Sequence, residues 1–146
     1  MNMKCKECFK PVGLPKFGNI AVLVLRLIAG LAFVFHGWGK IQNPMGWMGP
    51  EAPVPGIFQF LAALSEFGGG ICWILGLVMP VASTGIFFTM TVAVMTHMFM
   101  MKDPFVATKG GSSYEPALVY WGISILFLAL GPGKYSADTK LFGQRG

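Results

Sequence analysis

The sequence predicts an all-α membrane protein, a four-helix bundle with short cytoplasmic tails and a long outer loop between helices one and two. Hydrophobic residues make up 54% of the 146 residues and charged residues only 12%, which is far from the composition of a soluble domain. A chain of this length cannot bury so much apolar surface in its own core, so the surplus has to face lipid. The apolar stretches show no sustained period-two alternation, which favours helices over strands.

Proline and glycine separate four apolar stretches. The expected helices run from Asn19 to Phe35, Ile57 to Met79, Val81 to Met101 and Tyr114 to Leu130. Each has about 17 to 23 residues, enough to cross a hydrocarbon core of about 30 Å at about 1.5 Å per residue. Pro80 alone separates the second and third helices, which predicts a tight hairpin. The loop from Gly37 to Gly56 is long and rich in proline, and is a candidate lid over the outer end of the bundle.

Basic residues indicate how the helices are oriented. Seven lie in the flanks, Lys4, Lys6, Lys10, Lys16, Lys134, Lys140 and Arg145, and three in the outer loops, Lys40, Lys102 and Lys109. The positive-inside rule then places both termini in the cytoplasm. The net charge of +5 is interpreted as topology, and no nucleic acid is expected as a partner. The expected division is a basic tail over 1–16, a transmembrane domain over 17–133 and a second tail over 134–146.

Two charged side chains fall deep inside the expected helices. Arg26 lies about 10 Å from the inner end of the first helix, and Glu66 lies about 14 Å from the outer end of the second. An unpaired charge at such depth costs at least about 2.5 to 3.5 kcal/mol. We therefore expect an ion pair between Arg26 and Glu66, which either serves function or only fixes the packing of the two helices.

Other polar residues share helix faces with this pair. The two stripes are Arg26, His36 and Lys40 on the first helix, and Gln59, Glu66 and Trp73, at seven-residue spacing, on the second. His97 and Glu115 are expected at the depth of His36 and Lys40, which predicts a polar pocket in the outer half of the bundle. The glycines at 68–70 either allow close helix packing or leave room for a ligand beside Glu66.

Cysteine offers one further motif. Cys5 and Cys8 form a C-x-x-C between lysines, whose positive charge favours the thiolate. The pair is half of a zinc site, and a zinc or redox role stands beside a tail with two reduced thiols.

Ordered motifs along the chain carry a family resemblance. They are Arg26, Gly30, Phe33, His36-Gly37 and Lys40; Pro55-Gly56; Glu66, Gly69-Gly70, Leu75-Gly76 and Pro80; His97; Tyr114-Glu115; and Gly131 to Ser136. From about Leu25 to Asp138 the chain resembles the DoxX family of small bacterial membrane proteins, which implies a location in the bacterial inner membrane. The resemblance implies a four-helix bundle and, in one branch, a membrane subunit of a thiosulfate:quinone oxidoreductase, while other relatives are associated with quinones or oxidative stress. The family's polar positions correspond to Arg26, His36, Lys40, Glu66, His97 and Glu115.

The leading hypothesis is an integral membrane, redox-associated subunit that binds a quinone-like molecule or serves a membrane oxidoreductase complex. The expected proton-exchanging residues are Glu66, His36, His97 and Glu115, and the expected binding residues are Arg26, Lys40, Gln59 and Trp73. No haem, flavin or iron–sulfur signature is visible in the sequence, so electrons would come from a partner subunit. Whether the chain is itself an enzyme stays open. The alternatives are a non-enzymatic assembly subunit of a larger membrane complex and a small proton-coupled transporter, for which four helices suffice only in a homo-oligomer.

Overall fold

Apolar helices form the body of the protein, as predicted. The structure, a computed structural model, describes residues 9–144. Its helices are α2 (Lys16–Gln42), α3 (Gly56–Leu75), α4 (Met79–Met95), which continues into a π-helical turn (Thr96–Met100), α5 (Glu115–Leu130) and the short α6 (Ala137–Phe142). Three of these segments, 16–42, 56–75 and 79–100, are long and apolar enough to cross a membrane. The fourth apolar helix, α5, has 16 residues, or about 24 Å, and is shorter than the predicted span.

Helix boundaries follow the proline and glycine signals. Pro15 and Pro55 directly precede α2 and α3, and α4 and α5 each carry a proline in the first turn, where its missing N–H removes no helical hydrogen bond. Gly76 ends α3 in a left-handed conformation with φ of +64°, which costs little without a Cβ. The predicted tight hairpin between the second and third helices is therefore confirmed, but its turn consists of residues 76–78, and Pro80, which was expected to separate the helices, lies in the first turn of α4. The first helix is longer than predicted, since α2 continues through Gln42 and the loop begins at Asn43.

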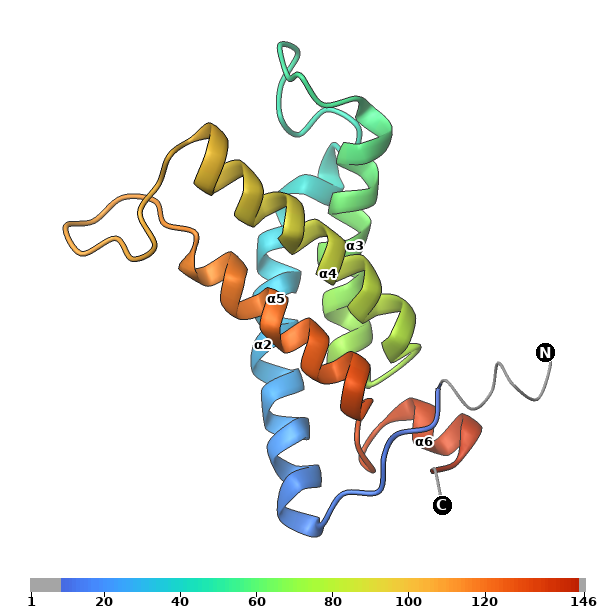
Figure 1. Ribbon diagram of the computed structural model, residues 1–146. Coiled ribbons are helices and arrows are strands. Elements are labelled where there is room, and N and C mark those ends of the chain that lie inside the picture. The colour runs from blue at the N-terminus through green and yellow to red at the C-terminus, as the bar shows by residue number, and fades with distance from the viewer. Residues whose placement is uncertain (1–8, 145–146) are drawn as a thin grey trace.

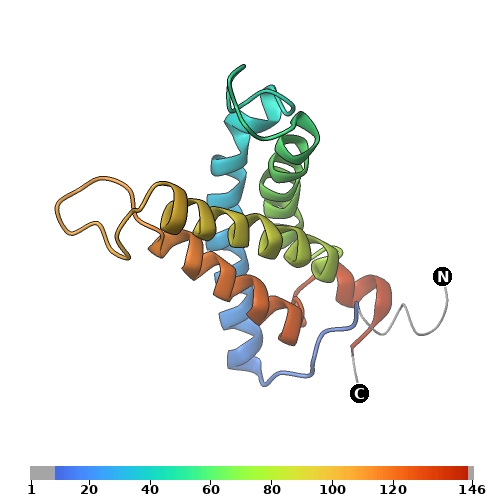
Figure 2. The ribbon, with the colours of Figure 1, turned by 45° about the horizontal axis from the view of Figure 1, so that its top comes forward.

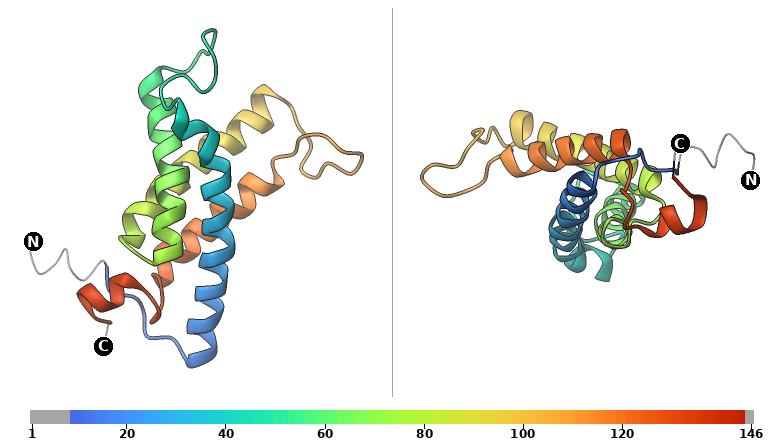
Figure 3. Two further views of the ribbon diagram at one scale, coloured as in Figure 1. Left: turned by 180° about the vertical axis from the view of Figure 1, so that it is seen from behind. Right: turned by 90° about the horizontal axis from the view of Figure 1, so that it is seen from below.

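The helices form two antiparallel pairs in two layers. Figure 1 shows α2 and α3 side by side, with α4 and α5 crossing them at an angle. The view from below in Figure 3 places α4 and α5 together on one side of α2 and α3. Because the pairs cross, the loop that joins α4 to α5 lies well away from the loop that joins α2 to α3, as Figure 2 also shows. We call the end of the bundle that carries these two loops the loop end. The opposite end, which carries α6 and residues 9–15, is the terminal end.

Glycines set the register of α2 against α3. A Cβ on Gly30 would lie 2.8 Å from the Gly70 carbonyl oxygen, and a Cβ on Gly70 would lie 2.8 Å from the Gly30 carbonyl oxygen. A Cβ on Gly37 would lie 2.5 Å from the backbone nitrogen of Phe67. Gly69 faces the other way, where a Cβ would lie 3.0 Å from Ile86 of α4. Two of the three glycines after Glu66 thus serve close helix packing.

An aromatic cluster fills the middle of the bundle. The Phe33 and Trp73 rings meet edge-on at 5.3 Å between centroids, and the Trp73 and Phe127 rings at 4.8 Å. The buried indole N–H of Trp73 donates to Ser83 Oγ at 3.0 Å, so its polar atom is satisfied. This cluster separates the terminal end from the loop end.

Segments that the sequence assigned to tails pack against the terminal end. The Val12 N–H donates to the Leu130 carbonyl at 3.0 Å. The fully buried Asp138 carboxylate accepts from the N–H groups of Val78 and Met79, at 2.7 and 2.9 Å, and so caps the start of α4,. Burial raises the pKa of the Asp138 carboxyl, and these two donors and the charge of Arg26 oppose that shift,. Which side of the membrane this end faces stays a prediction.

Candidate functional site

A polar cavity of about 380 Å³ lies between the two helix pairs, toward the loop end. Its lining comes from α2, α3, α4, α5 and the loop before α5: Phe33, His36, Lys40, Glu66, Met90, Ala93, His97, Gly111, Ser112, Ser113, Pro116, Ala117 and Tyr120. Four of the eight residues singled out in the sequence for the membrane site are among them, His36, Lys40, Glu66 and His97. We call this space the polar cavity.

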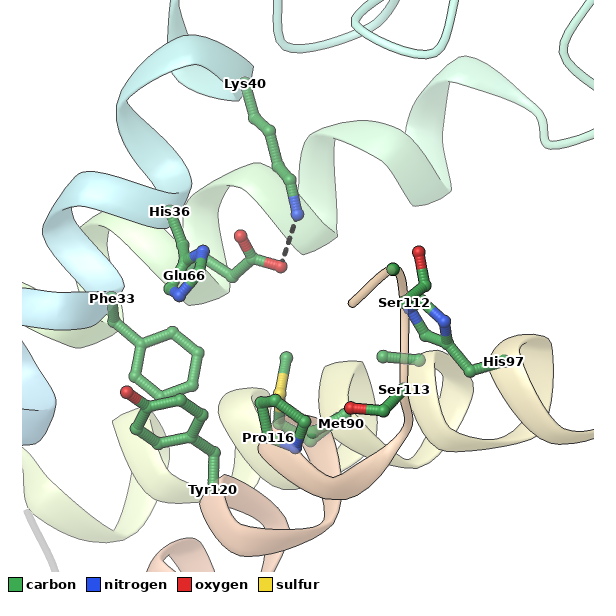
Figure 4. Close-up of a pocket in the computed structure, with 13 residues that line it drawn as sticks. Phe33, His36, Lys40, Glu66, Met90, His97, Ser112, Ser113, Pro116 and Tyr120 are labelled. Carbon is green, nitrogen blue, oxygen red and sulfur yellow. Dashed lines mark hydrogen bonds and ion pairs between the residues drawn. The ribbon is translucent and has the colours of Figure 1, made fainter. Parts of the chain in front are cut away.

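Glu66 is the charged centre of the polar cavity. Lys40 Nζ lies 2.6 Å from Glu66 Oε1, and the Glu66 side chain is only 4% exposed while that of Lys40 is 26% exposed. Figure 4 shows the pair at the edge of the cavity. The second carboxylate oxygen, Oε2, is buried and has no hydrogen-bond partner among residues 9–144. Such an oxygen costs about 1 to 3 kcal/mol, and more when charged, unless a donor reaches it.

The lysine is held from its other side by the loop between α2 and α3. Lys40 Nζ lies 4.5 Å from the centre of the Trp47 ring, a cation–π contact. Gln59 fixes this loop: its Oε1 accepts from the Met48 N–H at 3.0 Å, and its Nε2 donates to the Val54 carbonyl at 2.9 Å. The loop therefore orients Lys40 toward Glu66.

His97 faces Glu66 from the other side of the polar cavity. Its Nδ1 lies 2.7 Å from Asp103 Oδ2, and because an ionised carboxylate only accepts, Nδ1 carries the proton in that pair. Nε2 is then the ring nitrogen that Asp103 does not occupy. His97 lies in the π-helical turn 96–100, an irregularity that is frequent at functional sites because it re-aims side chains.

Aromatic side chains form the remaining wall. Phe33, His36 and Tyr120 lie together opposite His97 in Figure 4. Ring centroids are 4.8 Å apart for Phe33 and Tyr120 and 6.4 Å apart for His36 and Tyr120. The wall is therefore an aromatic surface that also carries the imidazole of His36 and the hydroxyl of Tyr120.

A second, more apolar cavity of about 780 Å³ lies between α3 and α4. We call it the lateral groove. Its lining includes Trp47, Phe58, Leu61, Phe88 and Val92, and it shares Lys40, Glu66, Ala93 and His97 with the polar cavity. The two spaces therefore meet at the Lys40–Glu66 pair.

The expected ion pair between Arg26 and Glu66 is wrong. Arg26 is 1% exposed, and its guanidinium donates to four backbone carbonyls instead. Nε donates to Trp73 at 2.8 Å, Nη1 to Pro132 at 2.7 Å and Tyr135 at 2.9 Å, and Nη2 to Ile74 at 2.9 Å. Arg26 thus ties the end of α3 to the segment after α5, and it lies outside both cavities.

Three other expected site residues lie elsewhere. Trp73 belongs to the aromatic cluster and lines neither cavity, whereas Gln59 lines only the lateral groove. Glu115 begins α5, where its negative charge interacts favourably with the helix dipole. It lies outside both cavities, so the structure does not bring it to His36, Lys40 and His97. Cys5 and Cys8 lie outside the described residues, and within 9–144 no group of three or more metal-binding side chains is present.

Sequence reasoning missed three polar residues. Tyr120 carried a signal, an aromatic side chain with a hydroxyl group within an apolar stretch. Asp103 follows His97 by six residues, a spacing that no regular helix brings together. Asp138 reaches α4 only because the chain turns back after α5, and the sequence carries no signal for that contact.

Comparison with known proteins agrees with this architecture. Residues 21–99 match the DoxX family. The chain is 32% identical over 132 residues to the Inner membrane protein YqjF of Escherichia coli, an alignment that covers 86% of this chain and 95% of the relative. No solved structure matches. With three helices long enough to span a bilayer, the match and the relative show that the chain is an integral inner-membrane protein that belongs to the DoxX family.

Proposed function

We propose that the polar cavity binds the headgroup of a quinone-like molecule and that the protein serves membrane redox chemistry together with a partner subunit. The observation that carries the proposal is the buried Glu66 Oε2 without a hydrogen-bond donor, beside a cavity of about 380 Å³. A volume in this range is typical of small-molecule sites.

The chemistry of Glu66 points to the kind of headgroup. Its Oε1 is engaged by Lys40, so Oε2 is the free acceptor. A hydroxyl on the ligand would supply the missing donor and remove the cost of a buried, unpaired oxygen. The reduced form, a quinol, carries such hydroxyls, whereas the oxidised quinone offers only acceptors. The cavity should therefore prefer the quinol.

Other side chains complement a flat, polar ring. The wall formed by Phe33, His36 and Tyr120 offers aromatic surface for stacking,. Across the cavity, the Asp103 carboxylate lies 2.7 Å from Nδ1 of His97 and orients its ring. A bound quinone supplies two-electron, two-proton chemistry. Glu66 and His97 are placed to hold the protons of that chemistry on opposite sides of the ring.

The test measures binding of a tail-free methylated benzoquinol, and of its oxidised quinone, to protein in lipid nanodiscs. Glu66→Gln should weaken quinol binding about tenfold or more, because the amide Nε2 donates where the carboxylate accepted. The same variant should gain affinity for the quinone, whose oxygens accept. Glu115→Gln, the same chemical change outside both cavities, should alter either affinity by less than about twofold.

Two results would overturn the proposal. One is wild-type protein that binds neither form, and the other is equal loss of quinol binding in the two variants. If no ligand binds and Glu66→Gln dissociates copurifying subunits, the assembly-subunit hypothesis takes its place.

A further inference from the structure

The lateral groove opens on the surface that the bilayer covers. It lies between α3 and α4, both long and apolar enough to span the membrane. Four large apolar side chains along it are exposed, Phe58 by 59%, Leu61 by 48%, Phe88 by 62% and Val92 by 64%. A hydrocarbon chain can therefore pass from the lipid phase into the groove without crossing water.

Small side chains keep the groove open between these apolar edges. Ala62 and Ser65 of α3 and Gly85 of α4 line it. A Cβ on Gly85 would lie 2.9 Å from Ser65 Oγ, so α4 approaches α3 closely at this point. Larger residues at these positions would fill the space where a chain could lie.

Charge at the inner limit of the groove defines its occupant. Lys40, Glu66 and His97 line both spaces, so a molecule in the groove meets a polar group at one end and apolar side chains along the rest. A purely apolar chain would leave Glu66 Oε2 without a donor. An apolar helix of a partner would also leave this oxygen without a donor and would remove the Lys40–Glu66 pair from water,. An amphipathic small molecule satisfies both parts.

We infer that the lateral groove holds the hydrocarbon tail of the ligand whose headgroup occupies the polar cavity, and that this ligand enters from the lipid phase between α3 and α4. The headgroup's identity rests on the proposed function, whereas the tail's position rests on the groove. In a bilayer the tail moves from one apolar environment to another, so hydrophobic free energy contributes little to its binding. Its contribution comes from packing contacts with the groove, which also fix where the tail lies. Affinities must therefore be compared between variants for one ligand, because partition into lipid is then the same.

The experiment compares two ligands with one headgroup, a tail-free methylated benzoquinol and the same quinol carrying a prenyl tail. Ala62→Phe fills the groove, and Ala21→Phe is the matched control on an exposed position of α2. Ala62→Phe should weaken binding of the tailed quinol about fivefold or more and change that of the tail-free quinol by less than about twofold. Ala21→Phe should leave both affinities unchanged. Equal effects of Ala62→Phe on both ligands, or no effect on the tailed one, would overturn the inference.

A second measurement uses the wild-type protein, so it does not depend on whether a variant folds. A tailed quinol with a photoreactive diazirine at the end of the tail should label wild-type α3 and α4 within 58–65 and 85–96, as read by mass spectrometry. Labelling confined to α2 or α5 would overturn the inference. Failure of the tail-free quinol to bind would instead count against the proposed function, so the two failures are distinguishable.

Discussion

The terminal end and the loop end of the bundle each contain a buried charged side chain, and the two side chains differ in how completely they are hydrogen-bonded. At the terminal end, Arg26 is 1% exposed and gives hydrogen bonds to four backbone carbonyls. At the loop end, Glu66 is 3% exposed, and one of its two carboxylate oxygens has no partner in the part of the chain that the structure describes. The aromatic cluster around Trp73 lies between them.

This difference distinguishes two buried charged residues that the sequence analysis expected to pair with each other. The hydrogen bonds of Arg26 hold the end of α3 and the chain after α5, so the arginine fixes the fold. Glu66 is held by one lysine and otherwise faces a cavity. A buried oxygen without a donor fits the binding role proposed for Glu66, because a ligand can supply that donor.

Removing Arg26 should have the largest effect on folding. Arg26→Met fits the same space but leaves the carbonyls of Trp73, Ile74, Pro132 and Tyr135 without their donor. We expect a loss of about 3 kcal/mol or more in the free energy of unfolding, as for other broken buried charge networks. Thermal unfolding in detergent measures it. Arg26→Lys should recover only part, since a single ammonium group cannot reproduce the guanidinium fork. A stable Arg26→Met variant would show that the terminal end does not depend on this residue.

Asp138→Asn should have an intermediate effect at the same end. One amide oxygen can replace one carboxylate oxygen, but the amide NH₂ meets the N–H of either Val78 or Met79,. We expect a loss of about 1 to 2 kcal/mol, as for a missing helix cap, measured by the same unfolding curves. Asp103→Asn, at the other end and partly exposed, serves as a control that should unfold at nearly the wild-type temperature.

Glu66→Gln should have the smallest effect on stability, although it has the largest on the proposed ligand. The amide oxygen can still accept from Lys40, and at the position of Oε2 an amide NH₂ without a partner replaces a carboxylate oxygen without a partner. Lys40 is 26% exposed, so water compensates for the lost charge of Glu66, and the free energy of unfolding should change by less than about 1 kcal/mol,. Unfolding as severe as that of Arg26→Met would mean that both ends are structural and would remove the contrast between them.

Much of the fold was predictable because local signals carry it. Runs of apolar residues bounded by Pro15, Pro55, Gly76 and Gly131 specify where helices begin and end. The polar residues expected inside the membrane were also recognisable, since charge within an apolar helix is costly wherever it points. His36, Lys40, Glu66 and His97 do meet around one cavity.

The pairing of these residues was not predictable, because it depends on how far one helix slides along another. The expected depths of Arg26 and Glu66 were counted from predicted helix starts at Asn19 and Ile57, whereas α2 and α3 begin at Lys16 and Gly56. The contacts of Gly37 with Phe67 and of Gly30 with Gly70 bring Glu66 level with the end of α2 that carries Lys40. The same register sets Arg26 beside the last turn of α3.

The sequence by itself determined that this chain is a helical membrane protein of the DoxX family with a small set of buried polar residues, because hydropathy and family motifs are written locally along the chain. Only the tertiary structure decided that Lys40 pairs with Glu66, that Arg26 holds backbone carbonyls, and that Asp103 and Asp138 take part. Those outcomes depend on helix register, on the crossing of the two pairs and on the return of the chain after α5. Each of these three features depends on contacts between residues far apart in the sequence, so no short stretch of residues determines it.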